Sequence, residues 1–288
     1  METNVWPQKD MKHSPTDIGA PLLGLRQLLR KLPRRVYGHV LSQSNMIIPR
    51  RHKHTWAQLS YAIQGYLEVW TAHARFVALP HRAVWIPPGI EHRVRTTPHT
   101  IIRSLYLDAQ APPVHWPDCR ILVIDPLLHE LIRTFSTLPI EYDEAGAEGR
   151  LVQVMLDRLA QAPEAGLVLP WPADPRLHTI CEHLHRRPDE ALSLTDYSRR
   201  LGISEKTLTR LFVQQTGLGF RLWRQRARLV HALPLLERGD RITDVALACG
   251  YDSLSSFIAA FRESTGVTPR AFMAAAGLDT PARPSAPA

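Results

Sequence analysis

Cysteine is scarce in this chain of 288 residues: Cys119, Cys181 and Cys249 are scattered, and none belongs to a Cys-x-x-Cys pair. An odd number of dispersed cysteines argues against a disulfide framework, and it favours a reducing compartment. Cys249 falls on an apolar stripe and is expected in the core. We therefore expect a cytoplasmic protein.

Long apolar runs are absent as well. No stretch approaches the roughly 20 apolar residues that a membrane-spanning helix needs. The first residues, Met1-Glu2-Thr3-Asn4, lack the charged-then-apolar pattern of a signal peptide. The sequence also contains no P-loop, no glycine-rich dinucleotide motif and no convincing nucleophile triad. We expect no membrane partner, and little in the chain points to catalysis.

Lysine is rare among the basic residues. Of 35 Lys and Arg residues only five are lysines, namely Lys9, Lys12, Lys31, Lys53 and Lys206. The net charge is +8, and residues 176–275 hold 15 basic and 10 acidic side chains, a net charge of +5. Arginine suits bidentate contacts with phosphate and guanine, so the bias is compatible with nucleic-acid binding. A GC-rich genome would produce the same bias.

The length suits two domains with full hydrophobic cores. Residues 1–20 read as a tail and 21–162 as the first domain, which opens with an amphipathic helix over 21–32. Residues 163–175 are rich in proline and predict an extended, semi-rigid linker. Residues 176–276 form the second domain, and 277–288 a disordered tail.

The second domain contains an internal repeat. Leu194-Thr195-Asp196 is echoed by Ile242-Thr243-Asp244, and further on Thr216-Gly217 matches Thr265-Gly266. Self-similarity at a period of 48 to 49 residues marks a repeated supersecondary unit. We place the two units at 194–214 and 242–264.

Each unit reads as helix, tight turn, helix. Gly202 and Gly250 supply the turn residues, because glycine tolerates a positive φ. Ser204 and Ser253 follow as N-caps of the second helix. This pattern predicts a helix-turn-helix, whose second helix enters the major groove of DNA. The alternative is a small helical bundle without a ligand, which two matched units on a basic segment disfavour.

These residues resemble the twin helix-turn-helix domain of the AraC/XylS family of bacterial transcription regulators. The resemblance rests on the segments at 200–204, 208–212, 216–217, 223–228, 242–246, 249–251 and 265–269. It implies a sequence-specific DNA-binding regulator, an activator, a repressor or both. The implied partners are double-stranded promoter or operator DNA, RNA polymerase, a small-molecule or metal effector and a second copy of the chain.

The family pattern assigns eight DNA-binding candidates: Ser204, Lys206, Thr209, Arg210, Ser253, Leu254, Ser255 and Arg262. Arg210 is the strongest base-reading candidate, because its guanidinium can pair with O6 and N7 of guanine. The second unit presents Leu254, Ser255, Ile258 and Ala259, which cannot make bidentate hydrogen bonds. We expect the first unit to carry most of the sequence specificity, with Arg262 and Arg270 contacting the DNA backbone.

The first domain is predicted to be rich in β-strands. Seven short runs of branched and aromatic residues, at 36–43, 57–63, 67–71, 74–79, 83–86, 92–95 and 101–106, alternate with Gly and Pro. Such spacing predicts a sandwich or small barrel. The fold class is therefore α+β multidomain, with an N-terminal β-barrel and an all-α C-terminal domain.

The motifs around 52–65 and 85–92 resemble those of the cupin superfamily, a jelly-roll barrel. That resemblance implies a metal site at His52, His54, Gln58 and His92. Imidazole suits Zn, Fe, Ni or Cu, but Gln58 stands where metal cupins most often have Glu. The alternative is that these histidines line an organic effector pocket or are structural. A metal-dependent cupin enzyme with a basic accessory domain is the competing function, and two matched DNA-reading units favour the regulator.

Helical periodicity continues at 126–138 and 149–159, after the barrel. The family resemblance implies that this pair makes a dimer contact, and packing against the barrel itself is the alternative. A long helix over 220–236 joins the two repeat units, and Pro234 is expected to interrupt or bend it. Arg221, Arg224, Arg226 and Arg228 of this helix are candidates for phosphate contacts or a solvated basic face.

Overall fold

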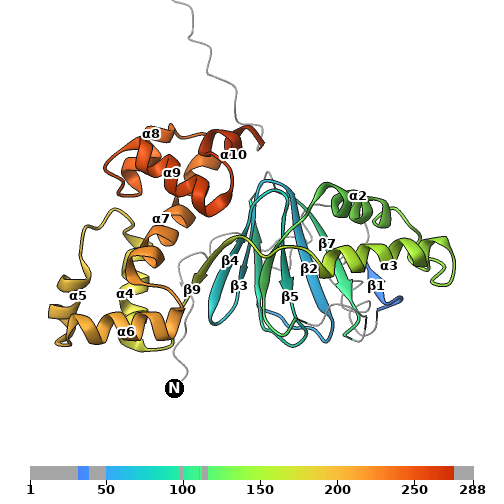
Figure 1. Ribbon diagram of the computed structural model, residues 1–288, viewed down its shortest axis with the longest axis horizontal. Coiled ribbons are helices and arrows are strands. Elements are labelled where there is room, and N and C mark those ends of the chain that lie inside the picture. The colour runs from blue at the N-terminus through green and yellow to red at the C-terminus, as the bar shows by residue number, and fades with distance from the viewer. Residues whose placement is uncertain (1–31, 39–49, 98–99, 110, 112–115, 276–288) are drawn as a thin grey trace, which may run out of the picture.

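The computed structural model describes residues 32–38, 50–97, 100–109, 111 and 116–275. The molecule is layered (Figure 1): a helical pair, two facing β-sheets and a C-terminal helical domain follow one another across it. Residues 21–31 of the predicted helix and both predicted tails lie outside the described residues; residue 32 is described and is not helical.

The first sheet has five antiparallel strands in the order β1-β7-β2-β5-β8. Their bounds are β1 Val36–Tyr37, β2 Ala57–Gln64, β5 Arg82–Ile86, β7 Ile101–Leu107 and β8 Arg120–Val123. Alternate residues of a strand face opposite sides. Leu59 and Tyr61 therefore pack outward on the helical pair, whereas Ala62 packs into the barrel core.

The second sheet has four antiparallel strands in the order β6-β3-β4-β9. Their bounds are β3 Leu67–Trp70, β4 Ala74–Ala78, β6 Arg93–Thr96 and β9 Leu167–Pro170. Leu67, Val69 and Phe76 point into the core between the sheets. The seven predicted strands match β1 to β7, with β1 traceable only over its described residues. β8 and β9 were not predicted.

The helical pair covers the outer face of the five-stranded sheet (Figure 1). It consists of α2 (Pro126–Phe135), whose N-cap is Asp125, and α3 (Ala147–Ala160). Leu128, Ile132 and Leu156 are buried against Leu59 and Tyr61 of the sheet. The pair thus packs on its own barrel, as the alternative interpretation proposed, and Leu127 and Val154 remain exposed on its other side.

The C-terminal domain is entirely helical within the described residues. It contains α4 (Pro175–Arg186), α5 (Leu194–Leu201), α6 (Glu205–Thr216), α7 (Phe220–Glu237), α8 (Ile242–Ala248), α9 (Leu254–Thr265) and α10 (Pro269–Ala275). α5–α6 and α8–α9 are the two predicted units, and α7 runs between them (Figure 1). Pro234 lies inside α7, which continues to Glu237, so the expected interruption is not found.

The repeat is visible in matching local contacts. Ser204 Oγ accepts from Thr207 N, and Ser253 Oγ accepts from Ser256 N, which confirms both predicted N-caps. The turn glycines Gly202 and Gly250 have φ of 64° and 73°, as predicted. A glycine is required there because a Cβ is disfavoured at positive φ.

The matching Thr-Gly ends of α6 and α9 also have a physical reason. Thr216 Oγ1 donates to Phe212 O at 2.7 Å, and Leu218 N donates to the same hydroxyl at 3.1 Å. Thr265 Oγ1 donates to Phe261 O at 2.6 Å in the second unit. The hydroxyl therefore satisfies backbone groups that a helix end leaves without partners.

The C-terminal domain docks on the outer face of the four-stranded sheet. Val77 and Leu79 of that face share a buried core with Leu233 of α7 and Phe261 of α9. Leu169 of β9 is buried with residues of α4 and α6. The predicted linker is extended, but β9 within it is a paired strand of the barrel, not a separate spacer.

Two further predictions from composition can be compared with the structure. Cys119, Cys181 and Cys249 are free, and Cys249 is buried in the core as expected. Within the described residues, no helix has both the length and the apolar character needed to cross a bilayer.

Candidate DNA-reading surface and effector site

The exposed face of α6 is the first candidate surface. Lys206, Thr209 and Arg210 are all exposed on it, opposite the buried Leu208 and Phe212. An open depression along this face is lined by Lys206, Thr209, Arg210, Val213 and Gln214. Ser204 is exposed at the start of the helix, where its side chain is engaged as the N-cap.

Val213 and Gln214 were not among the sequence-derived candidates. They lie four residues after Thr209 and Arg210, so they continue the same face of the helix. That spacing is the signal that identifies them. Val213 is 47% exposed, which is high for an apolar side chain without a partner in the fold.

The equivalent face of α9 is less polar. Leu254 is 38% exposed, and Ser255 and Arg262 are exposed as well. Ser253 is the N-cap, and Ile258, expected to point outward, packs partly against the core. The two units therefore have the same backbone pattern and different side-chain chemistry on the faces that would meet DNA.

Three arginines of α7 make contacts inside the protein. Arg224 Nη1 donates to Leu192 O at 3.1 Å and Arg228 Nε to Pro188 O at 2.9 Å, so both hold the segment between α4 and α5. Arg226 Nη1 donates to Val168 O of β9 at 2.8 Å. Burial lowers the pKa of Arg224 and Arg226. These three side chains therefore make structural contacts within the protein, and their role as phosphate contacts stays a prediction.

A second candidate site lies at one end of the barrel. His52 and His92 form an antiparallel bridge, with His52 N donating to His92 O at 3.0 Å and His92 N to His52 O at 2.9 Å. One ligand nitrogen from each of His52, His54 and His92 lies within 4.8 Å of the others. Three of the four predicted ligands therefore converge, although about 40 residues separate the two segments.

The hydrogen bonds of these three imidazole rings determine which ring nitrogen is protonated and which is available to a ligand. Nδ1 of His52, His54 and His92 lies 3.0, 2.6 and 2.9 Å from the carbonyl oxygens of Arg50, Trp56 and Ile90, respectively. Each Nδ1 therefore carries the proton, and Nε2 keeps a lone pair. A backbone carbonyl bonded to the other ring nitrogen is the usual support of a metal-binding histidine.

The fourth predicted ligand, Gln58, is buried beside His54. Gln58 Oε1 lies 2.9 Å from His54 Nε2, and Gln58 Nε2 donates to Ser60 Oγ at 2.8 Å. In this orientation the lone pairs of His54 Nε2 and Gln58 Oε1 face each other, which is unfavourable. A cation between the two atoms would remove the repulsion, and so would a rotation of the Gln58 amide by about 180°. Burial, with a smaller contribution from the other two rings, lowers the pKa of His92 to about 4. Its Nε2 is buried without a hydrogen-bond partner among the described residues.

The two domains together define the architecture of the protein. A β-barrel with a cluster of three histidines is docked on a helical domain that contains two helix-turn-helix units. Comparisons with known proteins agree. Residues 197–275 match a family model described as a helix-turn-helix domain, and residues 37–113 match the AraC-like ligand binding domain.

Curated relatives carry the same description. The chain is 36% identical over 224 residues to the HTH-type transcriptional regulator NimR of Escherichia coli K12, covering 77% of this chain and 81% of NimR. It is 35% identical over 103 residues to the HTH-type transcriptional regulator RipA of Corynebacterium glutamicum, covering 36% of this chain and 31% of RipA.

Solved structures match mainly over single domains. The DNA-binding domain of AdpA in complex with a target DNA is 30% identical, with a TM-score of 0.32, and covers 36% of this chain and 92% of that one. An AraC-type regulator from Chromobacterium violaceum is 28% identical, with a TM-score of 0.35, and covers 38% of this chain and 97% of that one.

The chain belongs to the AraC family of transcription regulators. It is a DNA-binding regulator with an N-terminal ligand-binding domain, as the resemblance implied.

Proposed function

We propose that the chain binds promoter DNA mainly through α6, under the control of an effector held at the histidine end of the barrel. The difference between the two reading faces carries this proposal. α6 presents Lys206 and Arg210, whose donors suit guanine and phosphate, whereas α9 presents Leu254 and Ser255. The first unit therefore reads bases, and the second positions the protein through Arg262 and apolar contacts.

The effector that fits the barrel end best is a divalent transition metal. Three Nε2 atoms with lone pairs, one of them buried without a partner, form a donor set that imidazole-binding metals prefer. His52, His54 and His92 would hold the ion, with Gln58 as a neutral fourth ligand. When bound, the ion would tie the segment around His52 to the segment around His92.

Elemental analysis of the tag-free native protein tests this assignment. A double variant, His52→Ala/His54→Ala, removes two ligands, and His73→Ala, an exposed histidine outside the cluster, is the matched control. We expect one equivalent of metal in the wild type and in the control, and none in the double variant. A metal-free wild type that also fails to take up Zn²⁺, Ni²⁺ or Fe²⁺ leaves the site to an organic effector.

We further propose that the chain acts as a homodimer in the cytoplasm, where a bacterial promoter and RNA polymerase are found. The exposed side of the α2–α3 pair supports the dimer, because Leu127 and Val154 are 53% and 47% exposed on it. This face is on the opposite side of the barrel from the DNA-binding domain (Figure 1), so pairing leaves both reading helices accessible.

The competing enzyme hypothesis depends on the same histidines. Metal bound at His52, His54 and His92 without any effect on DNA binding would favour it. Operator binding that changes when metal is added or removed supports a sensor, since a ligand shifts an equilibrium only by binding two states differently.

A further inference from the structure

The connection between the domains is held on two sides. We call residues 167–174 the strap. β9 within it pairs with β4 from Val77↔Leu167 to Ala74↔Pro170. Trp171 N then donates to His73 O at 2.7 Å. The first half of the strap therefore moves with the barrel.

The other side of the strap is hydrogen-bonded to α7 and packs on the first repeat unit. Trp223 Nε1 donates to Pro170 O at 2.6 Å, and Arg226 Nη1 donates to Val168 O at 2.8 Å. The indole of Trp171 packs on that of Trp223, with 5.7 Å between ring centroids. Leu169 is buried in the core that also contains Leu208 and Phe212 of α6. The polar contacts thus join the strap to α7, and the apolar contacts of Leu169 join it to α6.

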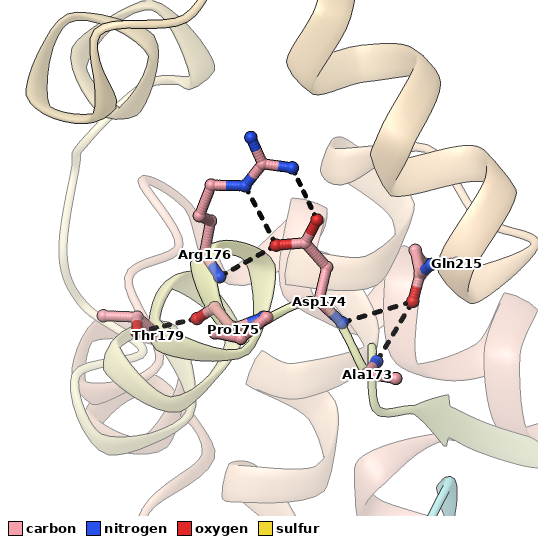
Figure 2. Close-up of polar contacts among 6 residues, drawn as sticks. All are labelled: Ala173, Asp174, Pro175, Arg176, Thr179 and Gln215. Carbon is pink, nitrogen blue, oxygen red and sulfur yellow. Dashed lines mark hydrogen bonds and ion pairs between the residues drawn. The ribbon is translucent and has the colours of Figure 1, made fainter.

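The strap ends on α6 itself. Figure 2 shows Gln215, in the last turn of α6, facing the backbone of the strap. Its Oε1 accepts from Ala173 N at 3.1 Å and from Asp174 N at 3.3 Å. Asp174 is in turn the N-cap of α4 and bonds Arg176 (Figure 2). One side chain therefore links the α6 helix to the end of the strap and the start of α4.

The second unit lacks this arrangement. Ser264 occupies the position of α9 that corresponds to Gln215 under the 49-residue offset. In the part of the chain that the structure describes, no hydrogen bond joins the strap to α8 or α9. A displacement of β9 against the barrel would therefore reach α7 through two hydrogen bonds. It would reach α6 through the packing of Leu169 and through Ala173 and Asp174, which Gln215 bonds, and it would reach α9 only through apolar packing.

We propose that Gln215 is a positioning residue for DNA recognition: it fixes α6 against the strap, and through β9 against the barrel. A guanidinium forms two hydrogen bonds with guanine only in a narrow geometry, so a small shift of α6 weakens base discrimination. Gln215 acts on DNA only through α6. The proposal rests on the proposed role of α6 in reading bases.

The test is the base preference of the full-length protein, measured by selection from a randomised duplex pool. Gln215→Ala removes both hydrogen bonds, Gln215→Glu keeps two acceptor oxygens, and Ser264→Ala is the matched control in the second unit. We expect Gln215→Ala to lower specific affinity about threefold to tenfold, the effect of one or two hydrogen bonds. The loss should be confined to the bases that Arg210→Ala affects. Gln215→Glu and Ser264→Ala should stay within about twofold of the wild type.

Two results would overturn the proposal. Unchanged preferences in Gln215→Ala, where Arg210→Ala does change them, would refute the role of Gln215 alone. A loss of affinity spread evenly over the bases that face both helix-turn-helix units, together with a lowered Tm, would mean that Gln215 only stabilises the fold. Unchanged preferences in Arg210→Ala would instead refute the reading role of α6, and with it the premise of the proposal.

A double variant tests whether the strap acts as a unit. Arg226→Met removes the bond to Val168 O and should weaken the same bases as Gln215→Ala. Contacts within one unit are not additive, so the double variant should be no more than about twofold worse than the stronger single variant. If the affinity losses of the two single variants multiplied in the double variant, the two residues would act independently, and the strap would not act as one unit. If Arg226 bound phosphate instead, Arg226→Met would weaken all sequences equally and reduce the salt dependence of binding.

Discussion

Arg75 of β4 and His185 of α4 meet across the boundary between the barrel and the DNA-binding domain, with Arg75 Nη1 3.4 Å from His185 Nε2. Arg75 also forms a buried ion pair with Glu68, which Trp70 Nε1 bonds at 2.8 Å. Nε2 of a neutral imidazole can accept from the guanidinium, whereas a protonated ring would direct a positive charge at it. The interface is therefore compatible with a neutral His185.

A first prediction follows from this histidine. Burial, followed by the charge of Arg75, lowers the pKa of His185 to about 4; Glu68, His231 and Arg186 also face it. A histidine whose pKa is lower in the folded state takes up protons on unfolding. Its stabilising contribution is therefore complete above about pH 6.5 and is lost as the pH falls towards 4.

The variant His185→Gln cannot titrate, so its stability should decline less between about pH 7.5 and about pH 4.5. Urea unfolding at both pH values measures the free energy of unfolding. Because other histidines contribute to the decline in both proteins, the difference between wild type and variant is the relevant quantity. Parallel declines would contradict the prediction.

The buried ion pair gives a second prediction. Arg75→Met leaves the carboxylate of Glu68 buried without its cation, which should cost about 3–5 kcal/mol of unfolding free energy. The double variant Glu68→Leu/Arg75→Met removes both charges and should be clearly more stable than Arg75→Met alone. Denaturant titration of the three proteins provides the numbers. A double variant as unstable as the single one would show that the packing of the arginine stem, not its charge, matters.

The third prediction concerns the asymmetry between the two units. Arg210→Ala should weaken operator binding by about 1–3 kcal/mol and relax the preference at one base position. Leu254→Ala should reduce specificity much less, because an apolar side chain makes no bidentate contact. A scan of single base substitutions against each variant tests both statements, and the reverse ranking would overturn the asymmetry.

The fourth prediction concerns assembly. Val154→Glu places a charge on the exposed side of the α2–α3 pair and should shift the protein from dimer to monomer at micromolar concentration. Leu247→Glu is the control, because Leu247 is 65% exposed but lies on α8, in the other domain. Sedimentation velocity reports the masses. A dimer that persists in Val154→Glu would exclude this face as the interface.

The elements that local chemistry specifies were predicted well. The caps Ser204 and Ser253, the turn glycines Gly202 and Gly250, and strands β2 to β7 depend on residues close in sequence, whose patterns are readable directly. The sequence also indicated His52, His54, Gln58 and His92 through a family resemblance, and the structure brings the three histidines together.

Other features could not be predicted from the sequence, because they depend on contacts between residues that are far apart in the chain. Val168 lies in a segment rich in proline, and nothing local indicates that this segment pairs with β4. Arg226 reads as a basic side chain on a helix surface, and only the position of β9 turns it into a donor to a strand carbonyl. Gln215 gives no sequence signal for its contact with the strap.

The sequence by itself determined that this protein has a β-rich N-terminal domain and two matched helix-turn-helix units, because periodicity, caps and turn residues act over a few neighbours. The tertiary structure decided how the domains are joined: which sheet face receives the helical domain, and which unit is bonded to the strap. These depend on the burial of Val77, Leu79 and Leu169 in clusters whose members lie as far along the chain as Phe272. Such long-range contacts are selected by the packing of whole surfaces, which no local pattern specifies.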